Sequence, residues 1–110
     1  PGALTIILPT IGNFSNYLNC DSNSIGFRVP ALKLAQDLLS QTGPLATTSA
    51  NLSGESPIKD PLEASIKFPG VPMLAPVPWP KSSGIASTVI EWKEGKWNLL
   101  RSGSIVLNIK

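Results

Sequence analysis

A cluster of prolines divides this chain and limits its fold more than any other feature. Five of the eleven prolines lie between residues 69 and 80, at positions 69, 72, 76, 78 and 80. Proline has no main-chain N–H and its ring clashes with the preceding helical turn, so a regular helix over this stretch is excluded. We expect residues 71–75 to form an edge strand and residues 76–84 to form an ordered surface loop.

Ahead of the proline cluster, apolar spacing predicts short strands and two helices. Strands are expected at residues 4–8, 24–29 and 45–47. Leucine and alanine recur at helical spacing over residues 31–41, with Pro30 in the first turn and Gly43 after the end. A second helix is expected over residues 61–67, because Asp60 is a suitable N-cap residue ahead of a proline.

Behind the cluster, the sequence is typical of antiparallel strands. Residues 86–92 alternate, residues 94–95 can turn, and residues 97–100 can pair back as a hairpin. A last strand is expected at residues 104–109. Residues 12–24, rich in Asn and Ser, indicate a loop or a weak helical turn. The pattern predicts an α/β (α+β) fold with a twisted mixed, largely antiparallel sheet and flanking helices.

Two absences limit the chemistry of this chain. Histidine is missing and Cys20 is the only cysteine. A Ser-His-Asp triad, a Cys-His pair, a His-ligated zinc site, a thiolate metal site and an internal disulfide are therefore excluded within it. We expect no covalent nucleophile and no metal-ligating residue, and we expect Cys20 to be inert. Any chemistry must depend on positioned polar groups, main-chain N–H donors, arginine and lysine.

The charge and hydropathy of the chain predict a cytoplasmic protein with no membrane partner. Nine basic and seven acidic residues give a net charge of +2. The basic residues are scattered, as on a solvated surface, so charge alone does not demand a nucleic-acid partner. No apolar run approaches the roughly 20 residues that span a bilayer. No basic segment followed by an apolar one suggests export, and a single cysteine is compatible with the cytoplasm.

The small polar residues at positions 47–54 are the strongest local candidate for a ligand site. They follow a predicted strand, and Ser49 and Asn51 are two residues apart, so an extended loop would place both on one side. Hydroxyl, amide and main-chain N–H groups in such a loop can hold phosphate or ribose oxygens. The same residue types also form ordinary turns, so both interpretations stand at this point.

Two arginines and one serine are further candidates. Arg28 lies near the end of a predicted strand, and Arg101 precedes a Ser-Gly pair; a guanidinium group can bind a carboxylate or a phosphate through two parallel hydrogen bonds. A solvated arginine is the alternative for each. Ser87 opens a predicted strand, where its hydroxyl can equally be structural. The three tryptophans, at positions 79, 92 and 97, are not interleaved with a basic stripe, which favours packing over base stacking.

Five short motifs run in order through nearly the whole chain. They are P-G-A-L-T at 1–5 (compared with P-G-P-x-T), G-F-R-V-P at 26–30 (G-x-R-x-P), T-S-A-N-L-S-G at 48–54 (T/P-S-A-N-x-S-G), S-T-V-I at 87–90 (S-T-V-V) and R-S-G-S-I at 101–105 (R-x-G-x-I). The S-A-N-x-S-G match is specific, and four further matches in the same order accompany it. Together they resemble the YrdC/TsaC family of L-threonylcarbamoyladenylate synthases.

The resemblance implies a YrdC/RibB-like fold and a nucleotidyltransferase. ATP, L-threonine and bicarbonate would give threonylcarbamoyl-AMP and pyrophosphate, with Mg²⁺ accompanying ATP as the substrate. A threonine carbamate oxygen would attack the α-phosphate without a covalent enzyme intermediate, which agrees with the missing histidine. The product would pass to a downstream threonylcarbamoyl-transferase complex for threonylcarbamoyladenosine modification of tRNA. An RNA partner, either tRNA or double-stranded RNA, is a further implication of the family.

The resemblance also assigns site residues. The ATP-binding residues would be Ser24, Ser49, Asn51 and Arg101. The threonine-binding residues would be Arg28, Thr47 and Ser87.

The chain departs from the family pattern at three places. Ala3 replaces the usual proline, and residues 78–84 stand where an acidic Gly-rich stretch is common. The Lys-x-Arg motif that reaches the triphosphate and a threonine-binding segment both belong upstream of the first motif. Because the chain opens without Met directly before an apolar strand, we expect residues 1–110 to be the C-terminal portion of a single YrdC-like domain, truncated at the N-terminus. We expect this portion alone to be inactive.

Two other functions compete with the synthase. A carbamoyl-adenylate domain of a hydrogenase-maturation protein shares the fold and the S-x-N motif, and larger flanking domains would favour it. A non-catalytic double-stranded RNA-binding module would bind RNA in a salt-dependent manner without binding ATP or threonine. A Lys-x-Arg motif upstream would favour the synthase over the RNA-binding module.

Overall fold

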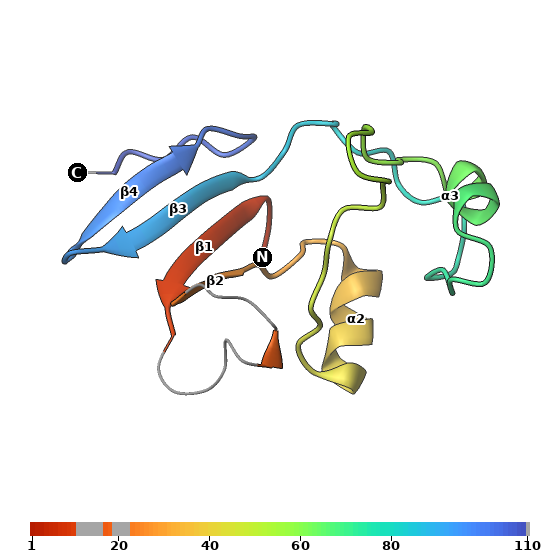
Figure 1. Ribbon diagram of the computed structural model, residues 1–110, viewed down its shortest axis with the longest axis horizontal. Coiled ribbons are helices and arrows are strands. Elements are labelled where there is room, and N and C mark those ends of the chain that lie inside the picture. The colour runs from red at the N-terminus through yellow and green to blue at the C-terminus, as the bar shows by residue number, and fades with distance from the viewer. Residues whose placement is uncertain (11–16, 19–22, 110) are drawn as a thin grey trace.

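The chain folds around one four-stranded sheet (Figure 1). The computed structural model describes residues 1–10, 17–18 and 23–109. Its elements are β1 (Leu4–Pro9), β2 (Ser24–Phe27), α2 (Lys33–Thr42), α3 (Pro61–Lys67), β3 (Thr88–Lys93) and β4 (Lys96–Arg101). The strand order is β2-β1-β3-β4, with β1 and β3 parallel and the two outer pairs antiparallel. The predicted mixed, largely antiparallel sheet is therefore confirmed.

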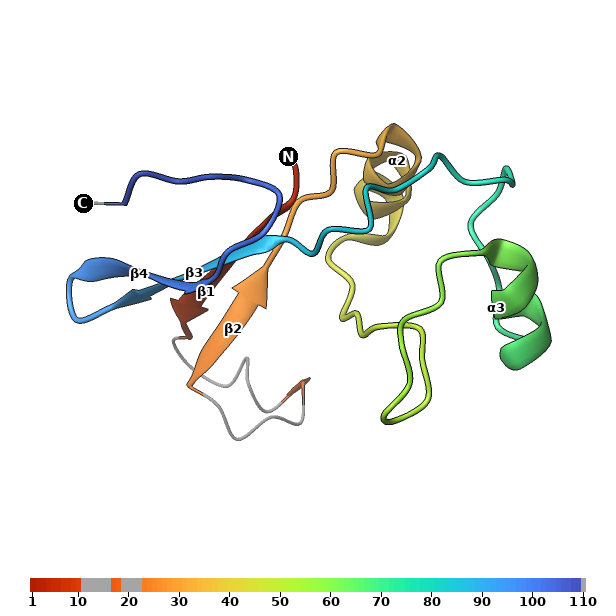
Figure 2. The same ribbon diagram turned by 90° about the horizontal axis from the view of Figure 1, so that it is seen from above.

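The buried centre of the described chain lies in the middle of the sheet. Ile90, Thr88 and Ser87 are buried, and Thr88 is only 1% exposed. β1 and β3 lie between the outer strands, so their branched side chains contact neighbours on both sides. Both helices lie to one side of the sheet (Figures 1 and 2), and neither contains a buried residue. The core therefore lies within the sheet. Residues 28–32 join β2 to α2, and the much longer stretch 68–87 joins α3 to β3.

Local sequence signals place the helices and the hairpin correctly. The Asp60 carboxylate accepts the Glu63 N–H at 3.0 Å at the start of α3, as expected of an N-cap. Gly43, with φ of 76°, ends α2. The chain turns from β3 into β4 at Glu94 and Gly95, whose φ values of 53° and 75° are those of a type I′ hairpin turn.

The start of α2 and the end of β2 differ from the prediction. Leu32 is extended, with φ of −67° and ψ of 116°, so α2 begins at Lys33 and Pro30 lies outside its first turn. The Pro30 carbonyl instead accepts the Gln36 side-chain amide at 2.8 Å. β2 ends at Phe27 rather than at residue 29. The predicted loop at 12–24 lies mostly outside the described residues, and Cys20 lies outside them entirely.

Three predicted strands are wrong. Residues 71–75 have no ladder, because prolines remove main-chain donors on both sides and the Val71 N–H bonds back to the Phe68 carbonyl at 3.2 Å. Residues 104–109 form no ladder, because the Ile105 main-chain carbonyl and N–H bond to the Thr88 hydroxyl at 2.6 and 3.1 Å and not to a neighbouring strand. Residues 45–47 run past α2 and not along a sheet edge (Figure 1).

Within the described residues, we find no helix that combines the length and the apolar character needed to cross a membrane.

Candidate functional site

Ser87 is the centre of a hydroxyl and guanidinium cluster at one end of the sheet. Its Oγ lies 2.9 Å from Thr5 Oγ1, so the two hydroxyls share a hydrogen bond. Arg101 donates from Nη2 to Ser87 Oγ and from Nε to the Ser87 carbonyl, both at 3.0 Å. Ser87 is 6% exposed whereas Arg101 lies at the surface. The guanidinium group uses two of its five N–H donors to hold Ser87, and three remain for an anion.

The strand register explains why these residues meet. Thr5 on β1 is the partner of Val89 on β3, and Val89 is the partner of Arg101 on β4. Paired residues share a face of the sheet, and Ser87, two residues before Val89, lies on that face too. Thr5, Ser87 and Arg101 therefore converge from three adjacent chain segments.

Arg28 approaches the same end of the sheet from β2. The β1–β2 register pairs Ile6 with Phe27, and its continuation by one residue places Arg28 opposite Thr5. The Arg28 Nε donates to the Gly2 carbonyl at 3.0 Å, and the Gly2 N–H donates to the Val29 carbonyl at 2.8 Å. Two exposed arginines thus flank the Thr5–Ser87 hydroxyl pair.

The segment after β4 braces this cluster from behind. A Cβ at Gly103 would lie 2.4 Å from both the Ala86 carbonyl oxygen and the Thr88 nitrogen, so only glycine allows the approach. The Thr88 hydroxyl donates to the Ile105 carbonyl at 2.6 Å and accepts the Ile105 N–H at 3.1 Å. The S-T-V-I and R-x-G-x-I motifs are therefore bonded directly to each other, which fixes Ser87 and Arg101 relative to one another.

The loop that contains the S-A-N-x-S-G motif is ordered by Asn51. Its Nδ2 donates to the Leu52 carbonyl at 3.0 Å and to the Glu55 carbonyl at 3.1 Å. Its Oδ1 is buried and has no hydrogen-bond partner among the described residues. The two accepting carbonyls fix which side of the amide is the nitrogen, so the open position is an acceptor. Thr47 and Ser49 in the same loop are exposed.

The structure brings together only some of the predicted site residues. Arg28, Ser87 and Arg101 lie at one end of the sheet, as described above. Ser24 pairs with Pro9, four residues along β1 from Thr5, or about 13 Å at the usual rise per strand residue. Thr47, Ser49 and Asn51 lie in the long loop between α2 and α3 (Figure 1).

Two residues of this cluster were not among the predicted site residues. Thr5 is the only hydroxyl residue in the apolar run that opens the chain, and this pattern marks it as a residue with a polar partner. Gly103 follows Arg101 by two residues, and a glycine beside a candidate site residue is typical of close main-chain approach. Neither signal shows which segment the partner comes from, because that depends on strand order.

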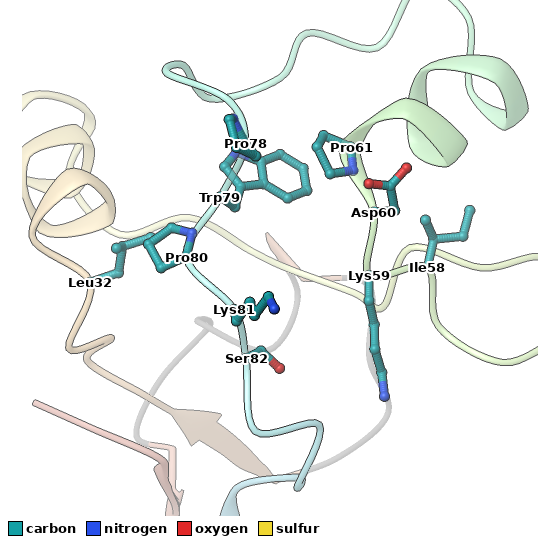
Figure 3. A pocket seen from close by; sticks show the side chains of 10 residues that line it. All are labelled: Leu32, Ile58, Lys59, Asp60, Pro61, Pro78, Trp79, Pro80, Lys81 and Ser82. Atoms are coloured by element: carbon teal, nitrogen blue, oxygen red, sulfur yellow. The ribbon is translucent and has the colours of Figure 1, made fainter.

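A separate cavity of about 790 Å³ lies between the start of α3 and the proline-rich segment (Figure 3). It is lined by Leu32, Ile58, Lys59, Asp60, Pro61, Pro78, Trp79, Pro80, Lys81 and Ser82. None of the predicted site residues lines it. In the described part of the chain, no group of three or more cysteine, aspartate or glutamate residues could hold a metal ion.

The fold and the site define a mixed α/β domain with paired arginines suited to anionic ligands. Residues 1–103 match the Sua5/YciO/YrdC family model, which carries the description "Telomere recombination". The chain therefore belongs to the Sua5/YciO/YrdC family, and the predicted resemblance is confirmed.

Similar proteins are named threonylcarbamoyl-AMP synthase. The chain is 40% identical over 77 residues to the one from Yersinia enterocolitica serotype O:8 / biotype 1B (strain NCTC 13174 / 8081), a match covering 68% of this chain and 40% of that protein. It is 39% identical over 77 residues to the one from Serratia proteamaculans (strain 568), covering 68% and 41%. The chain thus spans about two fifths of the length of these relatives. No solved structure matches it significantly.

Proposed function

We propose that this chain carries part of the substrate site of a threonylcarbamoyl-AMP synthase. The enzyme would join ATP, L-threonine and bicarbonate and release pyrophosphate, and its product would serve threonylcarbamoyladenosine modification of tRNA. The relatives that bear this name support the reaction. They also favour the synthase over a hydrogenase-maturation domain.

The observation that carries the proposal is the bonding of Arg101 to Ser87. The proposal assigns Arg28 and Ser87 to the threonine side, and Arg101 to the ATP side. Arg101 donates twice to Ser87 at 3.0 Å, so the two sides adjoin at this residue. A threonine carbamate held by Arg28 would then face an α-phosphate held by Arg101. Two fixed guanidinium groups would stabilise the charge that develops during attack without reorganising.

Asn51 supports an ATP-binding role for the loop at 47–54. A buried acceptor without a partner costs about 1–3 kcal/mol, so the Asn51 Oδ1 gains from a ligand donor. A ribose hydroxyl is such a donor. Under the proposal, Ser49 and Asn51 contact ATP, Thr47 lines the threonine pocket, and Ser24 reaches ATP from the other end of β1.

Magnesium enters the proposal with ATP and not as a resident ion. The described residues offer no carboxylate cluster for it, so its ligands would be mainly phosphate oxygens and water. Its contribution would be to neutralise phosphate charge.

Threonine binding by the purified chain tests the proposal. Isothermal titration with L-threonine should give a measurable affinity in the presence of bicarbonate, and Arg28→Gln should weaken it tenfold or more because the carboxylate loses its partner. Arg101→Gln should weaken ATP binding, and it should lower threonine affinity less than Arg28→Gln does, because Ser87 loses two hydrogen bonds but the carboxylate keeps its guanidinium partner. Lys93→Gln, on the exposed end of β3, is the matched control and should change neither.

Pyrophosphate release is the second measurement. We expect none from the chain alone with ATP, L-threonine and bicarbonate, because no Lys-x-Arg motif is present to hold the triphosphate. Release above background would contradict that expectation while supporting the reaction. Salt-dependent RNA binding without any affinity for threonine or ATP would contradict the synthase assignment and favour the RNA-binding module.

A further inference from the structure

The strand register divides the sheet into a charged face and an apolar face. All the charged residues of the four strands lie on the face that also carries Thr5; they are Glu91, Lys93, Lys96 and Arg101. The opposite face, called the apolar face below, carries two rows of side chains that cross all four strands. One row is Ile25, Leu8, Trp92 and Trp97, and the other is Phe27, Ile6, Ile90 and Leu99.

Within the described chain, the apolar face is covered at one end and open at the other. The segment after β4 covers the end at Thr88, whose hydroxyl bonds to the Ile105 main chain. Further along the strands, Trp92 and Trp97 are 37% and 38% exposed, and Phe27 and Leu99 are 46% and 49% exposed. Neither α2 nor α3 buries a residue, so neither helix supplies a layer over these side chains. Because a sheet with one apolar face normally buries that face against a second layer, a layer is missing here.

Trp92 and Trp97 form a rigid aromatic pair within the open area. They are cross-strand partners, and their rings meet edge to face with centroids 4.9 Å apart and planes at 62°. Each ring restricts the other, so little side-chain freedom is lost when a partner covers them. Tryptophan is also among the residues that contribute most to binding energy in protein interfaces. The pair is therefore suited to anchor a protein contact.

We propose that the apolar face packs against the same face of a second copy of this chain, which gives a symmetric sheet-on-sheet dimer. Without charged groups, the face offers a foreign partner no electrostatic selectivity, whereas two copies can meet there without like-charge repulsion. Their side chains can interdigitate with the sheets about 10 Å apart. Homodimer interfaces are also more apolar than those of transient complexes.

The exposed area is sufficient for such a dimer. The chain exposes 8673 Å², which is roughly 2,900 Å² more than a compact monomer of its mass. Each partner in a stable complex buries only about 800 Å². The cluster around Ser87 and Arg101 lies on the charged face, so the dimer leaves it open, and the inference does not depend on the synthase assignment.

Sedimentation equilibrium of the purified chain tests the dimer. Over chain concentrations of about 1–200 µM, the mass should rise from 11.6 kDa toward about 23 kDa. Trp97→Lys should raise the dimer dissociation constant tenfold or more, because the interface would bury an ammonium group without a partner. Ile66→Lys is the matched control, since Ile66 is 74% exposed on α3 beside the sheet, and it should change this constant less than twofold.

Tryptophan fluorescence gives a second measurement that does not require a destabilising variant. In a Trp79→Phe background, Trp92 and Trp97 are the only tryptophans left. Their emission should shift to shorter wavelength over the same concentrations as the rise in mass, because the dimer excludes water from both rings. Far-UV circular dichroism checks the fold of each variant.

Three results would each overturn the proposal. They are a monomeric mass at every concentration, which would leave the face to a different polypeptide layer, an emission maximum independent of concentration, and a dimer that Ile66→Lys disrupts as strongly as Trp97→Lys. Failure of the synthase assignment is seen separately, because threonine affinity depends on Arg28 and should be the same in Trp97→Lys as in the unchanged chain.

Discussion

At the scale of single residues, Gly103 is the glycine of the described chain that leaves the least space for a side chain. Its missing side chain lets the main chain after β4 approach Ala86 and Thr88, where an added Cβ would lie 2.4 Å from main-chain atoms. Main-chain atoms within a sheet cannot move aside as a flexible side chain can. The Arg101 hydrogen bonds to Ser87 lie beside this approach, so the packing behind β3 and the Ser87–Arg101 contact depend on one glycine.

Gly103→Ala should therefore lower the free energy of unfolding by about 2–3 kcal/mol, as overpacking does in a tight core. Urea denaturation followed by circular dichroism measures the change. Gly26→Ala is the matched control, because its Cβ would meet the Thr5 methyl group at an ordinary 3.4 Å. A Gly103→Ala variant as stable as Gly26→Ala would show that the close approach does not exist.

At the scale of elements, the turn between β3 and β4 carries a residue poorly suited to its backbone. Glu94 has φ of 53°, in the left-handed region, and Gly95 follows with φ of 75°. Asparagine tolerates this region better than glutamate, and Asn-Gly is the preferred pair in type I′ turns. Glu94→Asn should raise the free energy of unfolding by about 0.5–1 kcal/mol, measured by urea denaturation. Glu94→Ala keeps the strain and should change little; equal stabilisation by both variants would contradict the explanation.

The same elements show what the sequence could and could not predict. Both helices and the hairpin were predicted because their signals are local: Asp60 before a proline, Gly43 at an end, and Glu94-Gly95 between alternating strands. The strands at 45–47, 71–75 and 104–109 were wrong because apolar spacing does not show whether the main chain of a segment reaches a sheet edge. Strand order decides which edges are free, and it is a property of the whole sheet.

For the candidate site, too, the local motifs predicted the residues but not the contacts between distant segments. Arg28, Ser87 and Arg101 were selected from short motifs, and the structure brings them to one end of the sheet. The bond between Ser87 and Arg101, and the part played by Thr5, depend on the parallel pairing of β1 with β3 across more than 80 residues of chain. No local pattern contains that pairing.

At the scale of the whole molecule, this chain is more open than its size requires. Its accessible surface is 8673 Å², whereas a compact monomer of 11.6 kDa would expose about 5,800 Å². Its radius of gyration is 15.7 Å, against about 13 Å for a compact domain of this length. The helices contribute to this excess, since α2 and α3 lie beside the sheet (Figure 2) and bury no residue.

Stability should therefore be unevenly distributed, with the sheet far more resistant to opening than the helices. Helices of ten and seven residues are marginal without tertiary packing. The amides of β1 and β3 are bonded between strands at the buried centre and open only with the whole sheet. Native-state hydrogen exchange by NMR should show α2 and α3 amides exchanging at least tenfold faster than those of Ile6 and Ile90. If α2 amides exchanged as slowly as those of β3, the helices would be packed on the sheet in solution, and the open arrangement would be wrong.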